Sequence, residues 1–129
     1  MKRIIIDTNF LMIPSQFKID IFAEMDRVMS EPYQLCVFRA SVEELEKLKE
    51  KKDKDRQHVL VALKLIKQKN LKTLPNSVNE KYADKSILEG VTNKDIVCTQ
   101  DKELKRALKT KHKGIRFITL KSKKYLSIE

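Results

Sequence analysis

Residues 4–9 read Ile4-Ile5-Ile6-Asp7-Thr8-Asn9, a short run of β-branched apolar side chains that stops at a carboxylate. Similar apolar runs recur along the chain, separated by longer stretches with helical periodicity. Continuously apolar strands are typical of a parallel sheet that helices cover on both faces. The sequence therefore predicts an α/β class, a three-layer α/β/α fold with a central parallel sheet of about five strands. We expect strands near 3–6, 35–38, 71–74, 96–99 and 115–120, and helices near 18–30, 41–51, 54–69, 80–91 and 101–112.

The predicted connections are short, and no linker or internal repeat is visible. Pro14, Pro32, residues 75–77 and Gly114 mark them. A length of 129 residues lies within the usual range for one domain, and a hydrophobic content of 41% is sufficient to form a core. We therefore expect a single domain over residues 1–129.

The charge balance favours a polyanionic partner. The chain has 28 Lys and Arg against 18 Asp and Glu, a formal net charge of +10, which makes nucleic acid the leading candidate. A Lys- and Glu-rich surface that serves solubility or heat tolerance is the alternative. The charged stretch 47–56 joins two predicted helices, either as a solvated turn or as a contact to the RNA backbone through Lys51, Lys52 and Arg56.

Several other classes of protein find little support in the sequence. The N-terminus has only three apolar residues before Asp7, too few for a signal peptide or membrane span, so we expect a cytoplasmic protein without a membrane partner. Cys36 and Cys98 lie singly in apolar runs and are predicted to be buried in a reducing compartment. Two Cys and two His do not suffice for a zinc motif, and two glycines leave no phosphate-binding loop.

Two acidic residues follow predicted strands directly. Asp7 ends the first run, and Asp101 comes after the apolar run 96–98 and opens a helical pattern. Ligands of parallel α/β sheets bind beyond the carboxyl ends of the strands, so both positions are candidate sites. Each also suits a helix N-cap or a turn, which is the structural alternative.

Glu44 and Asp84 are the other two candidates, and each has its own alternative. Glu44 borders the apolar stripe of its predicted helix, but Ser41 and Glu44 also fit a capping box without a functional role. Asp84 lies within or beside a stripe formed by Ala83, Ile87 and Val91, so we expect it to be partly buried and to need a cation, hydrogen-bond donors or an open cleft. A first-turn position that complements the helix dipole is the alternative.

The four acids are most informative as a set. If Asp7, Glu44, Asp84 and Asp101 converge on one cleft, their mutual repulsion calls for a cation, and an oxygen-only set selects Mg²⁺ or Mn²⁺. One or two such ions can activate a water and stabilise charge on a phosphodiester. This is nuclease chemistry.

These positions lie in segments that together resemble the PIN-domain nucleases over nearly the whole chain. The resemblance implies that Asp7, Glu44, Asp84 and Asp101 bind metal and catalyse RNA cleavage, supported by Thr8, Asn9 and Thr99. In the pre-rRNA-processing branch of this family a second acid often follows the third acid, and this chain has Lys85 there. Lys85 either weakens metal binding or contacts phosphate. Lys85 and Lys102 are therefore further candidate RNA contacts. The four segments are 4–9, 42–48, 82–88 and 99–105.

The resemblance is greatest to archaeal PIN proteins similar to the pre-rRNA-processing branch or to VapC-type toxins. It implies a metal-dependent endoribonuclease that processes rRNA or tRNA or acts as the toxin of a toxin–antitoxin pair, with an antitoxin protein as partner. It also implies a homodimer. The alternative is a non-catalytic PIN-like module that binds RNA without cleaving it, for which Lys85 is the motivating departure.

Overall fold

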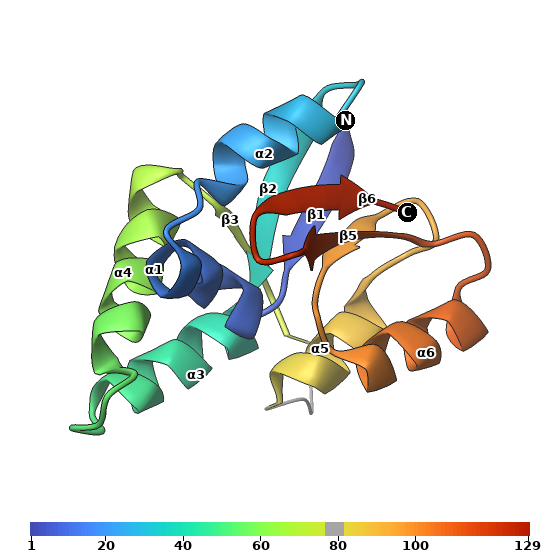
Figure 1. The fold of residues 1–129 in the computed structure, drawn as a ribbon. Coiled ribbons are helices and arrows are strands. Elements are labelled where there is room, and N and C mark those ends of the chain that lie inside the picture. The colour runs from blue at the N-terminus through green and yellow to red at the C-terminus, as the bar shows by residue number, and fades with distance from the viewer. Residues whose placement is uncertain (77–81) are drawn as a thin grey trace.

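The computed structural model describes residues 1–76 and 82–129 and places the Ile4–Ile6 run in a central strand of a sheet (Figure 1). The order in the sheet is β3-β2-β1-β4-β5-β6; the neighbours from β3 to β5 pair in parallel, and β6 pairs antiparallel to β5. The α/β prediction is thus confirmed, with one more strand in the described residues than expected. The strands are β1 (Lys2–Ile6), β2 (Tyr33–Phe38), β3 (Lys72–Leu74), β4 (Ile96–Cys98), β5 (Arg116–Lys121) and β6 (Tyr125–Ile128).

The helices follow the predicted order, except near the N-terminus. The helix predicted over 18–30 is present as the shorter α2, whose N-cap Asp20 accepts hydrogen bonds from two backbone amides. Helix α1 precedes it and was not predicted; it ends at Lys18, which has a φ of 57°. The connection expected at Pro14 is also wrong, because proline is tolerated in a first helical turn and lies there in α1. The helices are η1 (Asn9–Met12, 3₁₀), α1 (Ile13–Phe17), α2 (Ile21–Val28), α3 (Arg39–Lys49), α4 (Arg56–Gln68), α5 (Ala83–Gly90) and α6 (Lys102–Lys111).

The predicted helix over 80–91 is represented by α5. Its expected first two residues, 80 and 81, lie outside the described residues.

Two apolar clusters cover the faces of the sheet and create the three layers. Ile4 and Ile6 pack on one face against side chains from η1, α1, α2 and α4, with Leu45 of α3 among them. Ile5 points to the other face and packs against α5 and α6. The continuous apolar run of β1 is explained by this double burial, since all three isoleucines have no exposed surface. Cys36 and Cys98 are buried and free, as predicted.

The parallel pairing brings the carboxyl ends of the central strands together. Ile6 of β1 pairs with Cys98 of β4, and the Asp7 amide continues the pairing by donating to the Cys98 carbonyl at 3.0 Å. Helices α3 and α5 lie beyond this edge, toward the bottom of Figure 1. The residues that follow β1 and β4 therefore face the helices that carry the other two candidate acids.

A close contact sets the spacing between α3 and α5. Phe38, the residue before α3, is 3% exposed, and its ring fills the space beside Gly90 at the end of α5. A Cβ atom on Gly90 would lie 2.4 Å from the Phe38 ring, so only glycine fits without movement. This contact fixes the separation of the two helices.

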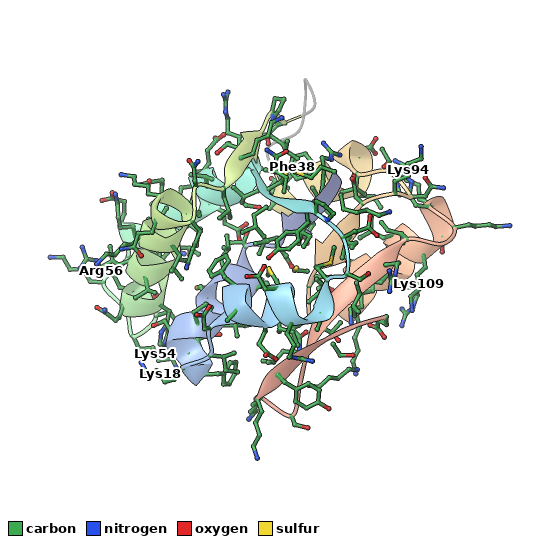
Figure 2. All side chains as sticks on the ribbon, turned by 90° about the horizontal axis from the view of Figure 1, so that it is seen from above. Lys18, Phe38, Lys54, Arg56, Lys94 and Lys109 are labelled. Carbon is green, nitrogen blue, oxygen red and sulfur yellow. The ribbon has the colours of Figure 1, made fainter. Side chains whose placement is uncertain are left out.

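Basic side chains are spread around the surface. In Figure 2 the labelled Lys18, Lys54 and Arg56 lie at one side of the molecule, and Lys94 and Lys109 lie at the opposite side. Within residues 1–76 and 82–129, no helix has both the length and the hydrophobicity to cross a membrane.

Candidate active site

Asp7 occupies the centre of the candidate site. It is 5% exposed, and its Oδ2 atom accepts a hydrogen bond of 2.8 Å from the Thr99 hydroxyl. Burial raises the pKa of Asp7 to about 6; the charges of Asp84 and Asp101 also raise it, whereas hydrogen bonds from Thr99 and the Thr8 backbone lower it. The strand end thus holds a carboxylate that is costly to ionise without a cation nearby.

Asp101 is held next to it by the start of α6. Its Oδ1 atom accepts hydrogen bonds from the amides of Glu103 and Leu104, and its own amide donates to the Thr99 hydroxyl at 3.0 Å. The N-cap alternative is therefore correct for Asp101. It does not exclude a ligand role, because within the described chain Oδ2 makes no hydrogen bond and the Thr99 hydroxyl bridges Asp7 and Asp101.

Asp84 differs from its prediction. It lies in the first turn of α5, as the helix-dipole alternative requires, and it is exposed instead of partly buried. The short helix buries Ala83, Ser86 and Ile87 and leaves Asp84 at its edge. Partial desolvation and then the charge of Asp101 raise the pKa of Asp84, so it belongs to the same electrostatic cluster.

Glu44 reaches the cluster from α3, and its capping-box alternative is wrong. The helix begins at Arg39, directly after β2, so Ser41 is inside it and cannot be its N-cap. The Glu44 carboxylate instead accepts a hydrogen bond of 3.2 Å from the Thr8 hydroxyl, next to Asp7 in the chain. Both Glu43 and Glu44 are exposed.

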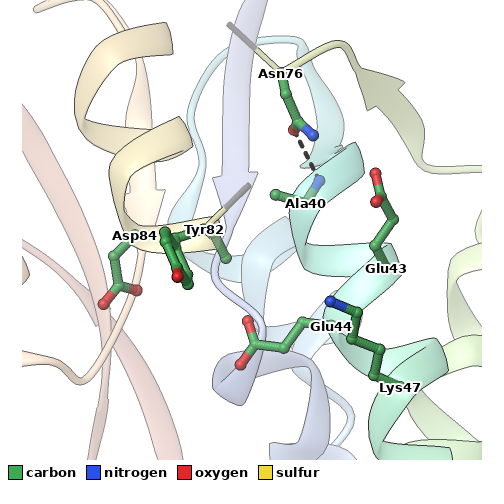
Figure 3. A pocket seen from close by; sticks show the side chains of 8 residues that line it. Ala40, Glu43, Glu44, Lys47, Asn76, Tyr82 and Asp84 are labelled. Carbon is green, nitrogen blue, oxygen red and sulfur yellow. Dashed lines mark hydrogen bonds between the residues drawn. The ribbon is translucent and has the colours of Figure 1, made fainter. Parts of the chain in front are cut away.

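A pocket of about 680 Å³ opens between α3 and α5. Glu44 extends across it from α3 toward the side on which Asp84 and Tyr82 lie, whereas Glu43 points away from them (Figure 3). The Asn76 side chain accepts a hydrogen bond of 2.8 Å from the Ala40 amide and closes one end. The pocket is thus walled by acids from two helices and is large enough for part of an extended polymer.

The four acids suit a hard cation by their chemistry. They supply only oxygen donors, and the charges of Asp84 and Asp101 oppose ionisation of Asp7, a repulsion that a divalent ion would relieve. As the side chains stand, no three His, Cys, Asp or Glu within residues 1–76 and 82–129 converge tightly enough to hold a metal ion. Ion binding therefore requires side chains to close in, and the exposed Glu44 and Asp84 have room to do so.

The predicted supporting residues divide into two groups. Thr8 and Thr99 are buried and donate to acids, at Glu44 and Asp7 respectively. Asn9 is exposed and, among the described residues, makes no hydrogen bond to any of the four acids; it lines a second pocket.

The predicted RNA contacts are all exposed. Lys51, Lys52 and Arg56 lie in the turn between α3 and α4 and at the start of α4, and Lys102 follows Asp101. The Lys85 ammonium lies 5.7 Å from the centre of the Tyr82 ring.

Six residues that line this pocket were not predicted as site residues: Ala40, Glu43, Lys47, Asn76, Tyr82 and Ala83. Lys47 follows Glu43 and Glu44 by one helical turn on the same helix, a spacing that could have indicated a shared face. No signal in the sequence distinguishes Asn76 or Tyr82.

The sequence of this chain is similar to a known family and to known proteins. A family profile described as a PIN like domain matches residues 4–123. Ribonuclease VapC4 of Methanocaldococcus jannaschii is 34% identical over 131 residues, which is 99% of this chain and 97% of that protein. The rRNA-processing protein FCF1 homolog of Homo sapiens is 28% identical over 125 residues, 95% of this chain; the chain spans 59% of that longer protein.

A solved structure agrees with the sequence comparisons. The PIN domain endonuclease Utp24 superposes with a TM-score of 0.82 and 29% identity, covering 98% of this chain and 90% of that one. The family match spans far more than half of the chain, and the strand order places acids from distant segments at one edge. The chain therefore belongs to the PIN-domain nuclease family.

Proposed function

We propose that the protein is a metal-dependent endoribonuclease that hydrolyses RNA phosphodiester bonds at the cluster of Asp7, Glu44, Asp84 and Asp101. The observation that carries the proposal is the proximity of three acids from different segments: after burial, the charges of Asp84 and Asp101 raise the pKa of Asp7, and after burial the charge of Asp101 raises the pKa of Asp84. Carboxylates that oppose one another's ionisation are costly in an apoprotein and useful around a cation. Membership of the nuclease family supports the same function.

The four acids would hold one or two Mg²⁺ or Mn²⁺ ions. A bound ion of this kind supplies an activated water and neutralises charge on the phosphodiester during in-line displacement. The chain itself orients the donors: Thr99 fixes Oδ2 of Asp7, and the first turn of α6 fixes Oδ1 of Asp101. Lys47, on the pocket wall, is placed to neutralise a neighbouring phosphate.

Two biological settings use this chemistry. The match to ribonuclease VapC4 supports a toxin with an antitoxin protein as partner, and the matches to FCF1 homologs and Utp24 support rRNA processing. Growth arrest on expression that requires Asp7 and that a co-expressed small protein relieves would identify the toxin role. A new 5′ end at one position of precursor rRNA would identify processing.

The decisive experiment for catalysis compares wild type with Asp7→Asn on labelled single-stranded RNA. We expect cleavage by wild type with Mn²⁺, none after EDTA, and none by the variant, whose unfolding transition shows that it still folds. Cleavage that survives both the substitution and EDTA would overturn the mechanism. Salt-sensitive RNA binding by wild type without cleavage in Mn²⁺ would support a non-catalytic RNA-binding module instead.

A further inference from the structure

A second pocket adjoins the segments that carry Asp7 and Asp101. It encloses about 480 Å³, is lined by residues of η1, α1 and the β5–β6 hairpin, and shares no lining residue with the first pocket. Asn9 and Gln100 connect it to the acids, since Asn9 follows Thr8 and Gln100 lies between Thr99 and Asp101. The pocket is therefore close enough to the acids to contact a polymer that is bound there.

The lining combines apolar side chains with amide groups. Ile13, Phe17 and Leu120 form the apolar part, and Phe17 is unusual among large apolar side chains because it is 37% exposed. The side chains of Asn9 and Gln16 are exposed and, among the described residues, have no hydrogen-bond partner. An aromatic ring can stack on the face of a nucleobase, and amide groups can donate and accept hydrogen bonds along its edge. The lining of this pocket supplies both.

The wall of the pocket is fixed by Gln100. Its side-chain amide donates to the Leu120 carbonyl at 3.2 Å and its oxygen accepts from the Leu120 amide at 2.7 Å, as a neighbouring strand would. The loop that carries Thr99 and Asp101 is therefore tied directly to the hairpin.

The turn of the hairpin supplies a positive charge at the rim. Ser122 and Lys123 have φ of 52° and 54°, a left-handed conformation that costs energy for residues other than glycine. This turn holds the Lys123 ammonium 5.9 Å from the centre of the Phe17 ring. Lys121 and Lys124, on either side of the turn, are also exposed. Aromatic surface and positive charge are thus presented together, as in grooves for single-stranded nucleic acid.

We propose that this pocket binds one unpaired nucleobase of the RNA substrate, the base stacking on Phe17 while Lys123 pairs with a flanking phosphate. The proposal rests on the proposed ribonuclease function and adds a requirement: the strand must be unpaired on this side of the cleaved bond. The charge of the rim complements the substrate backbone, and the apolar lining excludes a purely phosphate site.

The test measures binding without cleavage, in EDTA, by fluorescence anisotropy. The probes are labelled octamers of uridylate, of adenylate and of abasic ribose phosphate with the same charge. We expect wild type to bind the base-bearing octamers more tightly than the abasic one, and Phe17→Ala to lose about 5- to 100-fold in affinity for the base-bearing octamers alone. Tyr125→Ala, which removes an aromatic ring 47% exposed outside the pocket, should bind like wild type.

Lys123→Gly separates binding from stability. Glycine relieves the left-handed turn, so we expect a higher unfolding temperature together with weaker RNA binding and a smaller dependence on salt. A variant that is more stable and binds all octamers as tightly as wild type would overturn the role of Lys123.

Failure of this proposal is distinguishable from failure of the proposed function. Equal affinity of wild type for base-bearing and abasic octamers, or unchanged binding by Phe17→Ala, overturns the base pocket while Mn²⁺-dependent cleavage continues. Unchanged RNA binding with loss of a protein partner in Phe17→Ala would assign the pocket to that partner instead. Absence of both RNA binding and cleavage overturns the two proposals together.

Discussion

The two strand-end acids and the two helix acids reach the same cluster in different ways. Asp7 and Asp101 are held by hydrogen bonds from the Thr99 hydroxyl and from the first turn of α6. Glu44 and Asp84 are exposed on α3 and α5, and Glu44 has one hydrogen bond of 3.2 Å. One half of the proposed metal site, Asp7 and Asp101, is thus oriented by hydrogen bonds before any ligand binds, and the other half, Glu44 and Asp84, can adjust. Preorganised charge contributes most to catalysis, so the two halves should differ in the cost of their removal.

The largest expected difference concerns cleavage rate. Asp101→Asn keeps an N-cap side chain but removes a prepared charge, so we expect a loss of about 1000-fold in kcat/KM. Asp84→Asn removes an exposed charge that water can partly replace, and about 10-fold loss is expected. Steady-state cleavage of one RNA substrate in Mn²⁺ checks both. A greater loss for Asp84→Asn than for Asp101→Asn would contradict the division into halves.

The second difference concerns pH and stability. Because burial raises the pKa of Asp7 from 3.8 to about 6, the folded state holds this proton more tightly than the unfolded state. The stabilisation is present below about pH 4 and is lost as pH rises through 6, at most about 3 kcal/mol. We therefore expect Asp7→Asn without metal to be more stable than wild type at pH 7.5 and about equal at pH 4.

Denaturant unfolding at the two pH values provides the measurement. Wild type should regain stability at pH 7.5 when Mn²⁺ is added, and Asp7→Asn should regain little. Asp84→Asn serves as the matched exposed control, with a smaller effect of pH. An Asp7→Asn variant less stable than wild type at pH 7.5 without metal would show that the carboxylate is not strained there.

The third prediction tests the spacing between α3 and α5, the helices that carry Glu44 and Asp84. A Cβ atom on Gly90 would meet the buried Phe38 ring at 2.4 Å, so Gly90→Ala should push α5 away from the start of α3. We expect about 1–3 kcal/mol lower stability and reduced cleavage per folded molecule. Thermal unfolding and cleavage at a temperature where the variant is folded measure the two effects.

Gly114→Ala is the control for Gly90→Ala. It is strained by a φ of 83° but has open space around a Cβ atom and lies outside the site. It should lose stability without losing cleavage per folded molecule. Equal effects of both substitutions on cleavage would mean that the Phe38 contact does not position the site.

The two halves also differ in how well the sequence predicts them. Asp7 and Asp101 could be placed because each directly follows an apolar strand, and parallel strands end at one edge. The start of α3 could not be predicted, because the chain passes from β2 into the helix at Arg39 without a capping side chain. The sequence alone is therefore equally compatible with a capping box at Ser41 and Glu44, which the structure excludes because Ser41 lies inside α3.

The strands also differ in how well the sequence predicts them. The central strands are β-branched runs buried on both faces, a signal that does not depend on distant residues. Strand β6 lacks that signal: it has one buried residue, Leu126, and its turn uses Ser122 and Lys123 where a hairpin usually has Asn or Gly. The pairing with β5 that defines β6 is formed between segments and is not encoded in either one alone.

The smallest predicted effect compares two threonines. Thr99 donates to Asp7 at 2.8 Å in a buried position, and Thr8 donates to Glu44 at 3.2 Å in a partly buried one. Thr99→Val removes the side-chain donor of the buried Asp7 carboxylate and leaves it only the Thr8 backbone amide, so the pKa of Asp7 should rise further and cleavage should fall about 10-fold. Thr8→Val frees a side chain that water can reach, and a loss of only about 2-fold is expected. Both valines keep the shape of the threonine side chain. The ratio of the two losses in kcat/KM therefore measures how much more Asp7 and Asp101 depend on their hydrogen bonds than Glu44 and Asp84 do. A ratio of one would mean that the bound ion, and not the chain, positions the four acids.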